Sequence, residues 1–188
     1  MNRAIAVVVL SAGVTLGLVG AQEPKVNPDA KLLQDFKKGI DAYMDIHRRL
    51  EKKAPPLKET DDPAKIKASQ DTLAALIRTE RASAKQGEIF TPEIAQLFRR
   101  LMYPEIKGEQ GKETKQALKE DAPNPKAITL KVNARYPDSA PLPTVPPNLL
   151  ANLPQLPKDL EYRIIGNDLI LRDVQANLIA DYILKAIR

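Results

Sequence analysis

The first half of the chain places its apolar residues at the spacing of amphipathic helices. Between residues 29 and 54 they recur at every third or fourth position, which puts six side chains on one helical stripe. These are Leu33, Phe36, Ile40, Tyr43, His47 and Leu50. Two similar stripes follow Asp62-Pro63 and Thr91-Pro92, where an N-cap residue precedes a proline that suits the first helical turn. Each helix has one apolar face to bury, so the pattern predicts a bundle of about three helices.

Proline and glycine mark the expected ends of these helices. Pro55-Pro56 stops the first, Gly87 suits the C-terminus of the second, and Pro104 ends the third. Residues 107–121 are nearly all charged or polar. They therefore predict either an exposed helix or a loose connector.

Beyond residue 127 the hydrophobic period changes from that of a helix to that of a strand. Apolar and polar side chains alternate from Ile128 to Tyr136, which predicts a half-buried strand. Residues 137–157 then hold seven of the sixteen prolines together with five leucines. Because leucines on a free linker would stay in water, we expect this segment to wrap over the domain, with a short helical turn near residues 148–152.

The C-terminal stretch predicts a β-hairpin with a defined register. Gly166-Asn167 fits a two-residue type II′ turn. The cross-strand pairs that follow are Leu160 with Asp173, Tyr162 with Leu171 and Ile164 with Leu169. On the opposite face, Glu161 lies across from Arg172 as a favourable charge pair.

A second turn, at Gln175-Ala176, extends the hairpin to a third strand. It returns three more residues to the apolar face, namely Leu178, Ala180 and Tyr182. A slip of one residue would expose the whole apolar set, so the register is well specified. We therefore expect a three-stranded meander over residues 160–183, which the strand at 128–136 would join as a fourth.

Together these elements predict an α+β protein with its helices before its sheet. We expect a signal peptide at residues 1–21 and a helical region at 22–122. The proline-rich wrap and a small antiparallel sheet of three to four strands follow at 123–188.

The N-terminus has the pattern of a secretory signal. A positive start at Arg3 precedes an apolar run from Ala4 to Leu18, and Val19-Gly20-Ala21 offers the small residues that signal peptidase reads. Cleavage after Ala21 is the favoured interpretation, and retention as a membrane anchor is the alternative. The sequence has no second run long enough to span a bilayer, so we expect an exported protein of the bacterial periplasm or the extracellular space.

Composition excludes several classes of function. The chain has no cysteine, which removes disulfides, thiolate catalysis and thiolate metal sites. The formal net charge is +5, but the basic residues alternate with acidic ones along the chain and form no cluster. The chain has no tryptophan. Nucleic-acid binders cluster their charge and use aromatic platforms, so we expect no nucleic-acid partner. The serines lie in no nucleophile motif and no phosphate-binding loop is present, so we predict no catalytic, cofactor-binding or metal-binding residues and no cofactor.

Four residues remain as possible contacts with a partner or ligand. His47 is the single histidine and would be the default general base or metal ligand, but it lies on an apolar stripe, where a packed histidine is the alternative. Arg163, Arg172 and Asp181 are expected to share the polar sheet face with Glu161. That face would bind an anion or an acidic partner, or form a solvated salt-bridge ladder.

Two stretches carry a resemblance to known proteins. The chain resembles uncharacterised exported bacterial proteins at Phe90-Thr91-Pro92-Glu93 and in the hairpin residues Leu160–Gly166 and Leu169–Val174. The resemblance covers the chain after residue 21. It implies the fold and the location rather than an activity. The hairpin alone is similar to the C-terminal hairpin of small periplasmic proteins of the nickel/cobalt-homeostasis type, although this chain has no histidine-rich tract.

Three hypotheses for function follow. The first is a non-enzymatic interaction or structural module, whose partner would be another envelope protein that adds to a sheet edge or meets the polar sheet face. The second is a small-ligand or metal-ion binder built around His47. The third is a hydrolase that uses two carboxylates across a groove. The oligomeric state stays open.

Overall fold

The computed structural model describes residues 27–54, 60–120 and 128–187 of the chain. The expected signal peptide, at residues 1–21, lies outside these residues. The helices are α1 (Pro28–Glu51), α2 (Pro63–Glu80), α3 (Pro92–Ile106), α4 (Gly108–Glu120) and α5 (Pro147–Ala151), and the strands are β1 (Leu160–Ile165), β2 (Asp168–Asp173) and β3 (Leu178–Ile183). The protein is thus α+β, with its longer helices before its sheet. None of the helices described is both long and apolar enough to span a bilayer.

The predicted helix starts are confirmed by their caps. The side chain of Asn27 accepts a hydrogen bond from the backbone of Asp29, Asp62 accepts one from Ala64, and in each case a proline opens the helix. Thr91 accepts from the backbone N–H of Ile94 before α3. These side chains satisfy amide groups that have no partner inside the helix.

Two predicted helix ends are wrong. The second helix ends at Glu80 rather than at Gly87, because the chain from residue 81 onward turns to bond with the sheet. The third continues through Pro104 to Ile106. Proline removes one helical hydrogen bond, and so close to the end of a helix only the last turn bears that loss. Within residues 107–120, the helical alternative is the one formed, as α4 (Gly108–Glu120).

The sheet has the order β1-β2-β3, and the first hairpin has the predicted register throughout. Leu160 pairs with Asp173, and Ile164 pairs with Leu169. Gly166 has a φ of +60°, as the first central position of a type II′ turn requires. The alternation of apolar residues therefore fixed this hairpin.

The second hairpin contains a bulge that the sequence analysis did not predict. Asp173 pairs with Leu178 as expected, but the register then shifts, so that Leu171 lies opposite Asp181 rather than Ala180. The extra residue moves Tyr182 off the helix-facing side, where it was expected, and onto the other face of the sheet. It also brings Asp181 to the helix-facing side.

Residues 128–136 do not form a strand of the sheet. Their burial alternates, with Ile128, Val132 and Tyr136 buried, but Asn133 adopts a left-handed φ of +63° that interrupts the extended backbone. A single bridge joins Arg135 to Leu178 at the outer edge of β3. Three backbone hydrogen bonds join residues 133–136 to residues 177–179, but they form only this one bridge, and the described sheet has three strands.

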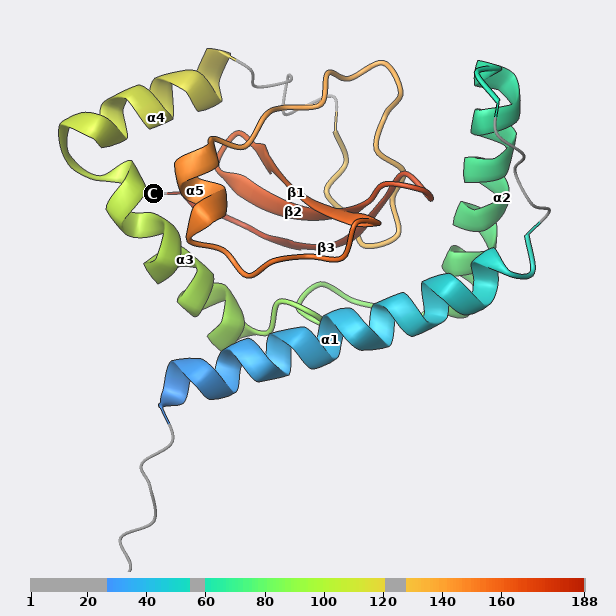
Figure 1. Ribbon diagram of the computed structural model, residues 1–188, viewed down its shortest axis with the longest axis horizontal. Helices are drawn as coiled ribbons and strands as arrows, with labels where there is room; N and C mark the ends of the chain where they lie inside the picture. The colour runs from blue at the N-terminus through green and yellow to red at the C-terminus, as the bar shows by residue number, and fades with distance from the viewer. Residues whose placement is uncertain (1–26, 55–59, 121–127, 188) are drawn as a thin grey trace, which may run out of the picture.

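Both faces of the sheet are covered (Figure 1). On one side α1 lies along the sheet, with α2 and α3 at its two ends. The main core joins the phenylalanines Phe36, Phe90 and Phe98 to Tyr162 and to the inward residues of the strands. On the other side Ile128 and Tyr136 pack on Ile165, Ile170 and Ile179. The second face is thus closed mainly by residues 128–136, whereas the buried leucines of the predicted wrap, Leu149 and Leu153, belong to the main core.

Candidate functional site

His47 lies in a buried polar cluster between α1 and the β2–β3 turn. Its Nδ1 is 2.6 Å from Oδ2 of Asp173, and its Nε2 is 2.8 Å from Oε1 of Gln175. Both His47 and Asp173 are almost fully inaccessible to solvent. The histidine is thus on the packed stripe that the periodicity predicts, and its partners come from a turn more than 120 residues further along the chain.

Asp173 is surrounded by donors. It accepts hydrogen bonds from the hydroxyl of Tyr43 at 2.7 Å and from the backbone N–H of Ala176 at 2.8 Å, in addition to His47. Burial and the negative charge of Asp173 raise the pKa of Tyr43 well above its ordinary value. Burial alone would lower the pKa of His47, but the hydrogen bond and charge of Asp173, with help from Gln175, raise it above 6.5.

The contacts of this cluster are those of a structural link rather than of a reactive site. Both ring nitrogens of His47 are occupied, and the hydroxyl closest to it belongs to a tyrosine held in its neutral form. Among residues 27–54, 60–120 and 128–187, no three His, Cys, Asp or Glu side chains gather in a way that would hold a metal ion. The geometry instead links α1 to the turn between β2 and β3.

Arg172 and Arg163 are committed to contacts within the chain. Arg172 is buried, donates to Oδ1 of Asn177 and, at 2.6 Å, to Oε1 of Glu161, and lies over the ring of Tyr136. Arg163 also pairs with Glu161 and donates to the carbonyl of Pro143. Burial tends to raise the pKa of Glu161, but the two guanidinium groups outweigh it and lower that pKa. The polar sheet face expected to meet a partner is thus covered by the chain's own residues 136–145.

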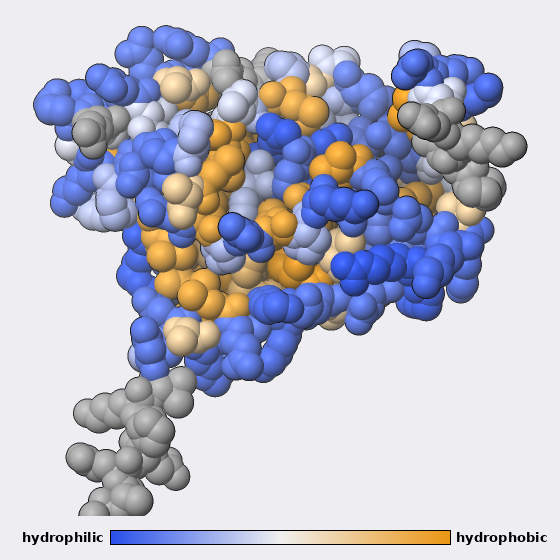
Figure 2. Space-filling model, in the orientation of Figure 1, coloured by the Kyte–Doolittle hydropathy of each residue, from blue (hydrophilic) through white to orange (hydrophobic). Residues whose placement is uncertain are grey.

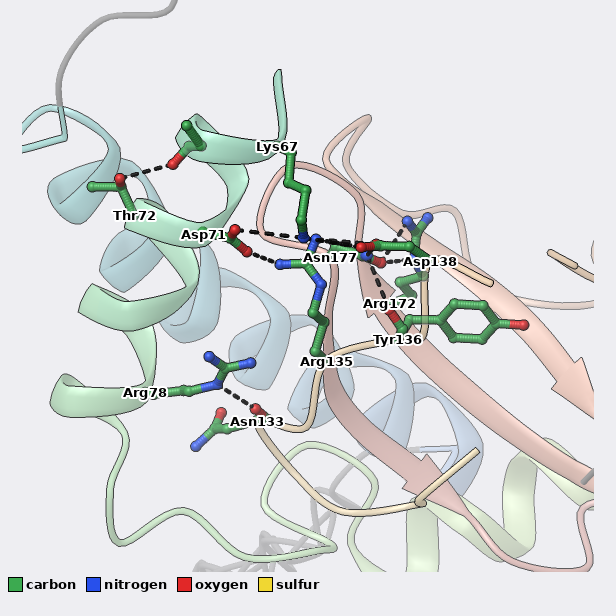
Figure 3. Close-up of polar contacts among 11 residues, drawn as sticks. Lys67, Asp71, Thr72, Arg78, Asn133, Arg135, Tyr136, Asp138, Arg172 and Asn177 are labelled. Carbon is green, nitrogen blue, oxygen red and sulfur yellow. Dashed lines mark hydrogen bonds and ion pairs between the residues drawn. The ribbon is translucent and has the colours of Figure 1, made fainter. Parts of the chain in front are cut away.

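A chain of polar contacts leads from this face to α2 (Figure 3). Asn177 donates to Oδ1 of Asp138, and Lys67 reaches the same carboxylate at 3.0 Å. Arg135 forms ion pairs with Asp138 and with Asp71 on α2. Hydrogen bonds from Lys67 and Arg135 lower the pKa of Asp138. These exposed pairs fasten the wrap to α2, and individually such pairs stabilise little.

Asp181 is not on the polar sheet face, and that expectation is wrong. It is fully buried, and its carboxylate accepts hydrogen bonds from the backbone N–H groups of Gly87, Ile89 and Phe90 at 2.8 to 3.0 Å. The bulge before it turns this side chain toward the α2–α3 loop. A hydrophobic-period argument cannot foresee a bulge, so the sequence placed Asp181 one face away from its position.

Two grooves on the surface have a different character from these saturated clusters. The first, of about 600 Å³, lies between α1 and the residues that follow α5. Its lining comprises Leu33, Phe36, Lys37, Ile40, Asp41, Leu101 and residues 152–157. Figure 2 shows hydrophobic side chains gathered on this side of the molecule, over α5 and between α3 and α1.

The second groove, of about 440 Å³, runs along β1. It is lined by Leu160, Glu161, Tyr162 and Arg163 of that strand and by residues from the proline-rich segment, including Leu150. The two grooves share residues 153–156, which we call the strap. The buried Leu153 and a 3.0 Å hydrogen bond from the Tyr162 hydroxyl to the carbonyl of Pro154 hold the strap in place.

The sequence analysis missed these grooves, although it noticed their leucines. It expected the leucines of residues 137–157 to be buried, and Leu149 and Leu153 are. Leu150 and Leu142 remain more than two fifths exposed. The leucines of this proline-rich stretch were therefore the sequence signal for the grooves.

Comparisons with family models, with curated proteins and with solved structures gave no match to this chain. The resemblances noted from the sequence thus stay predictions. The described residues define an α+β protein with one mainly apolar surface groove, one groove of mixed polarity and no reactive cluster among them.

Proposed function

We propose that the protein is an exported, non-enzymatic interaction module of the bacterial cell envelope. It binds an extended, apolar segment of another envelope protein in the two grooves that flank the strap. Export rests on the pattern of residues 1–21, and binding rests on the grooves.

One observation carries the binding proposal: a groove lined by both apolar and polar side chains borders a strand that has no further strand beyond it among the described residues. An edge strand offers backbone donors and acceptors to an incoming chain, and adjacent pockets select its side chains. The sizes of both grooves fall within the range of ligand sites. The other edge of the sheet, at β3, already meets residues 133–136.

The alternative functions find less support in the described residues. A binder built around His47 would need a free ring nitrogen, and both nitrogens have partners. A carboxylate-dependent hydrolase would need two carboxyl groups across one groove. Each groove is lined by a single carboxylate, Asp41 in the first and Glu161 in the second.

Photocrosslinking in intact cells tests the proposal. A photoreactive amino acid at the exposed Gln155, in the strap, would form an adduct with the partner, and the same amino acid at Lys53 serves as a remote control. We expect an adduct at position 155 alone, mapped by mass spectrometry to an extended segment. The first groove is disrupted by Leu33→Glu and the second by Leu150→Glu, both at exposed positions.

Each groove variant should reduce the adduct yield at least about fivefold, because a buried carboxylate in an apolar groove is strongly disfavoured. Ile66→Glu, an equally exposed apolar position on α2, should leave the yield unchanged. The proposal fails if no adduct forms in the envelope fraction, or if Ile66→Glu lowers the yield as much as the groove variants.

A further inference from the structure

A second surface, on α3 and the C-terminal residues, combines basic and exposed apolar side chains. Its members are Arg99, Arg100, Tyr103, Lys107, Leu184 and Lys185, and we call it the α3 patch. Tyr103 is 49 % exposed and Leu184 is 44 % exposed. A hollow of about 490 Å³ lies beside them, lined also by Ile106 and Ala186.

Specific contacts hold the α3 patch in shape. Arg99 donates to the backbone carbonyls of Leu184 and Lys185, at 2.8 and 3.2 Å, and so ties α3 to the end of the chain. The ammonium group of Lys107 lies 4.8 Å from the centre of the Tyr103 ring. The patch is therefore a formed surface with charged groups beside an aromatic ring.

The α3 patch lies next to the start of α1. Arg100 forms a 2.6 Å ion pair with Asp29, in the first turn of that helix. Residues 19–27 separate the apolar run that ends at Leu18 from α1. A chain of that length spans at most about 30 Å. The apolar run therefore ends within that distance of the start of α1, beside which the α3 patch lies.

Its composition matches an interface between lipid and water. Tyrosine is enriched at such interfaces, and the long stems of lysine and arginine lie along apolar surface while their charges reach the headgroups. Basic side chains are also attracted to anionic lipids near the membrane surface. The α3 patch holds four of them: Arg99 donates to the carbonyls of Leu184 and Lys185, Arg100 pairs with Asp29, and Lys107 and Lys185 are exposed, with the backbone N–H of Lys185 bonded to Asp168.

We propose that the α3 patch docks on the surface of a membrane that contains anionic lipids, and that it keeps the protein at the membrane whether or not the N-terminal segment is removed. This inference goes beyond the proposed binding of an envelope protein and uses a different surface. It rests on the proposed function only in its choice of membrane, the one that the protein crosses.

The absence of tryptophan from the chain permits a clean test. Tyr103→Trp in the full chain places a single reporter in the α3 patch, and Ile66→Trp places one on α2, at the other end of α1 (Figure 1). Vesicles of phosphatidylglycerol and phosphatidylcholine, with brominated acyl chains, quench a tryptophan that enters the interface. We expect Trp emission at position 103 to shift to the blue and to be quenched, and emission at position 66 to remain unchanged.

Charge reversal provides the second arm of the test. Lys107→Glu with Lys185→Glu should remove most of the quenching of the reporter at 103, whereas the same change at Lys52 and Lys53, at the far end of α1, should not. No quenching at 103, equal quenching at both reporters, or an equal effect of the two charge reversals would overturn the proposal. Because the vesicle test needs no export and no protein partner, its failure is distinct from failure of the proposed function.

Discussion

At the scale of single residues, the buried pair of His47 and Asp173 dominates the chemistry. The stripe of the first helix predicted that His47 is packed, and the structure confirms its burial. Its partner could not be predicted, because Asp173 reaches it only through the tertiary fold. A carboxylate beside a buried imidazole replaces the solvation that burial removes.

The pair makes stability depend on pH. The pKa of His47 is raised in the folded state above the 6.5 of the unfolded chain, so its contribution is fully present below pH 6.5 and is lost as the pH rises through the folded pKa. We predict that the free energy of unfolding of the wild type exceeds that of His47→Gln most at about pH 5, and that the excess shrinks by about pH 9. Urea denaturation across this range measures it.

The variant Asp173→Asn tests how much the negative charge of Asp173 contributes to stability. The asparagine keeps an oxygen for the N–H of Ala176 but cannot neutralise an imidazolium. Removing one partner of a buried pair costs about 3 kcal/mol, so the variant should lose about that much stability at pH 5. Without the carboxylate, burial lowers the pKa of His47, so in this background the imidazole should cost stability below pH 6.5 instead of contributing to it. A loss on His47→Gln that still grows toward pH 5 in this background would contradict the assignment.

At the scale of elements, local patterns predicted the helix caps and the first hairpin correctly. Both depend on residues close in sequence: a cap lies within three positions of its amide, and a two-residue turn fixes the register of its flanking strands. The bulge at Leu171/Arg172 and the loss of strand structure at Asn133 were not predictable in this way. They arise where β3 meets α2 and the loop beyond it.

Asp181 is the link between β3 and the α2–α3 loop. Asp181→Ala would leave the buried N–H groups of Ile89 and Phe90 without an acceptor, each at about 1 to 3 kcal/mol. We predict a loss of at least about 3 kcal/mol in the free energy of unfolding, measured by urea denaturation. Asp45→Ala, at an exposed position of α1, is the control and should change stability by less than about 0.5 kcal/mol.

Two glycines should respond in opposite directions to alanine. Gly166 has a positive φ in the hairpin turn, where a Cβ is strained, so Gly166→Ala should destabilise by about 1 kcal/mol. Gly39 lies inside α1, and a Cβ there would meet Ile89 at an ordinary contact distance of 3.5 Å. Gly39→Ala should therefore stabilise the protein by up to about 1 kcal/mol. Midpoints of thermal unfolding for both variants check the pair, and a stabilised Gly166→Ala would contradict the turn assignment.

At the scale of the whole molecule, the wrap decides which surfaces remain for binding. The sequence predicted a wrap over the domain but left the polar sheet face open to a partner. In the structure, residues 128–145 cover that face and accept hydrogen bonds from it at Tyr136, Pro143 and Asp138. Polar residues that the sequence leaves open for a partner thus form hydrogen bonds within the chain.

Of the exposed apolar side chains, Leu33 and Leu150 line the grooves beside the strap, and Tyr103 and Leu184 lie in the α3 patch. Grooves form from residues distant in sequence, α1 with the segment after α5, so no local pattern announces them. Two roles are therefore separated: buried polar clusters hold the fold, and the two grooves are the surfaces that we propose for binding.

The most direct test of this separation is the adduct yield from the photoreactive amino acid at position 155. It is measured in a variant of the grooves and in a variant of the buried polar cluster. One carries Leu33→Glu and Leu150→Glu, and the other carries Asp173→Asn. The account predicts that the groove variant loses the adduct while its unfolding midpoint stays near that of the wild type, and that Asp173→Asn keeps the adduct while its midpoint falls. A lost adduct in Asp173→Asn at a temperature where that variant is folded, with an intact adduct in the groove variant, would contradict it.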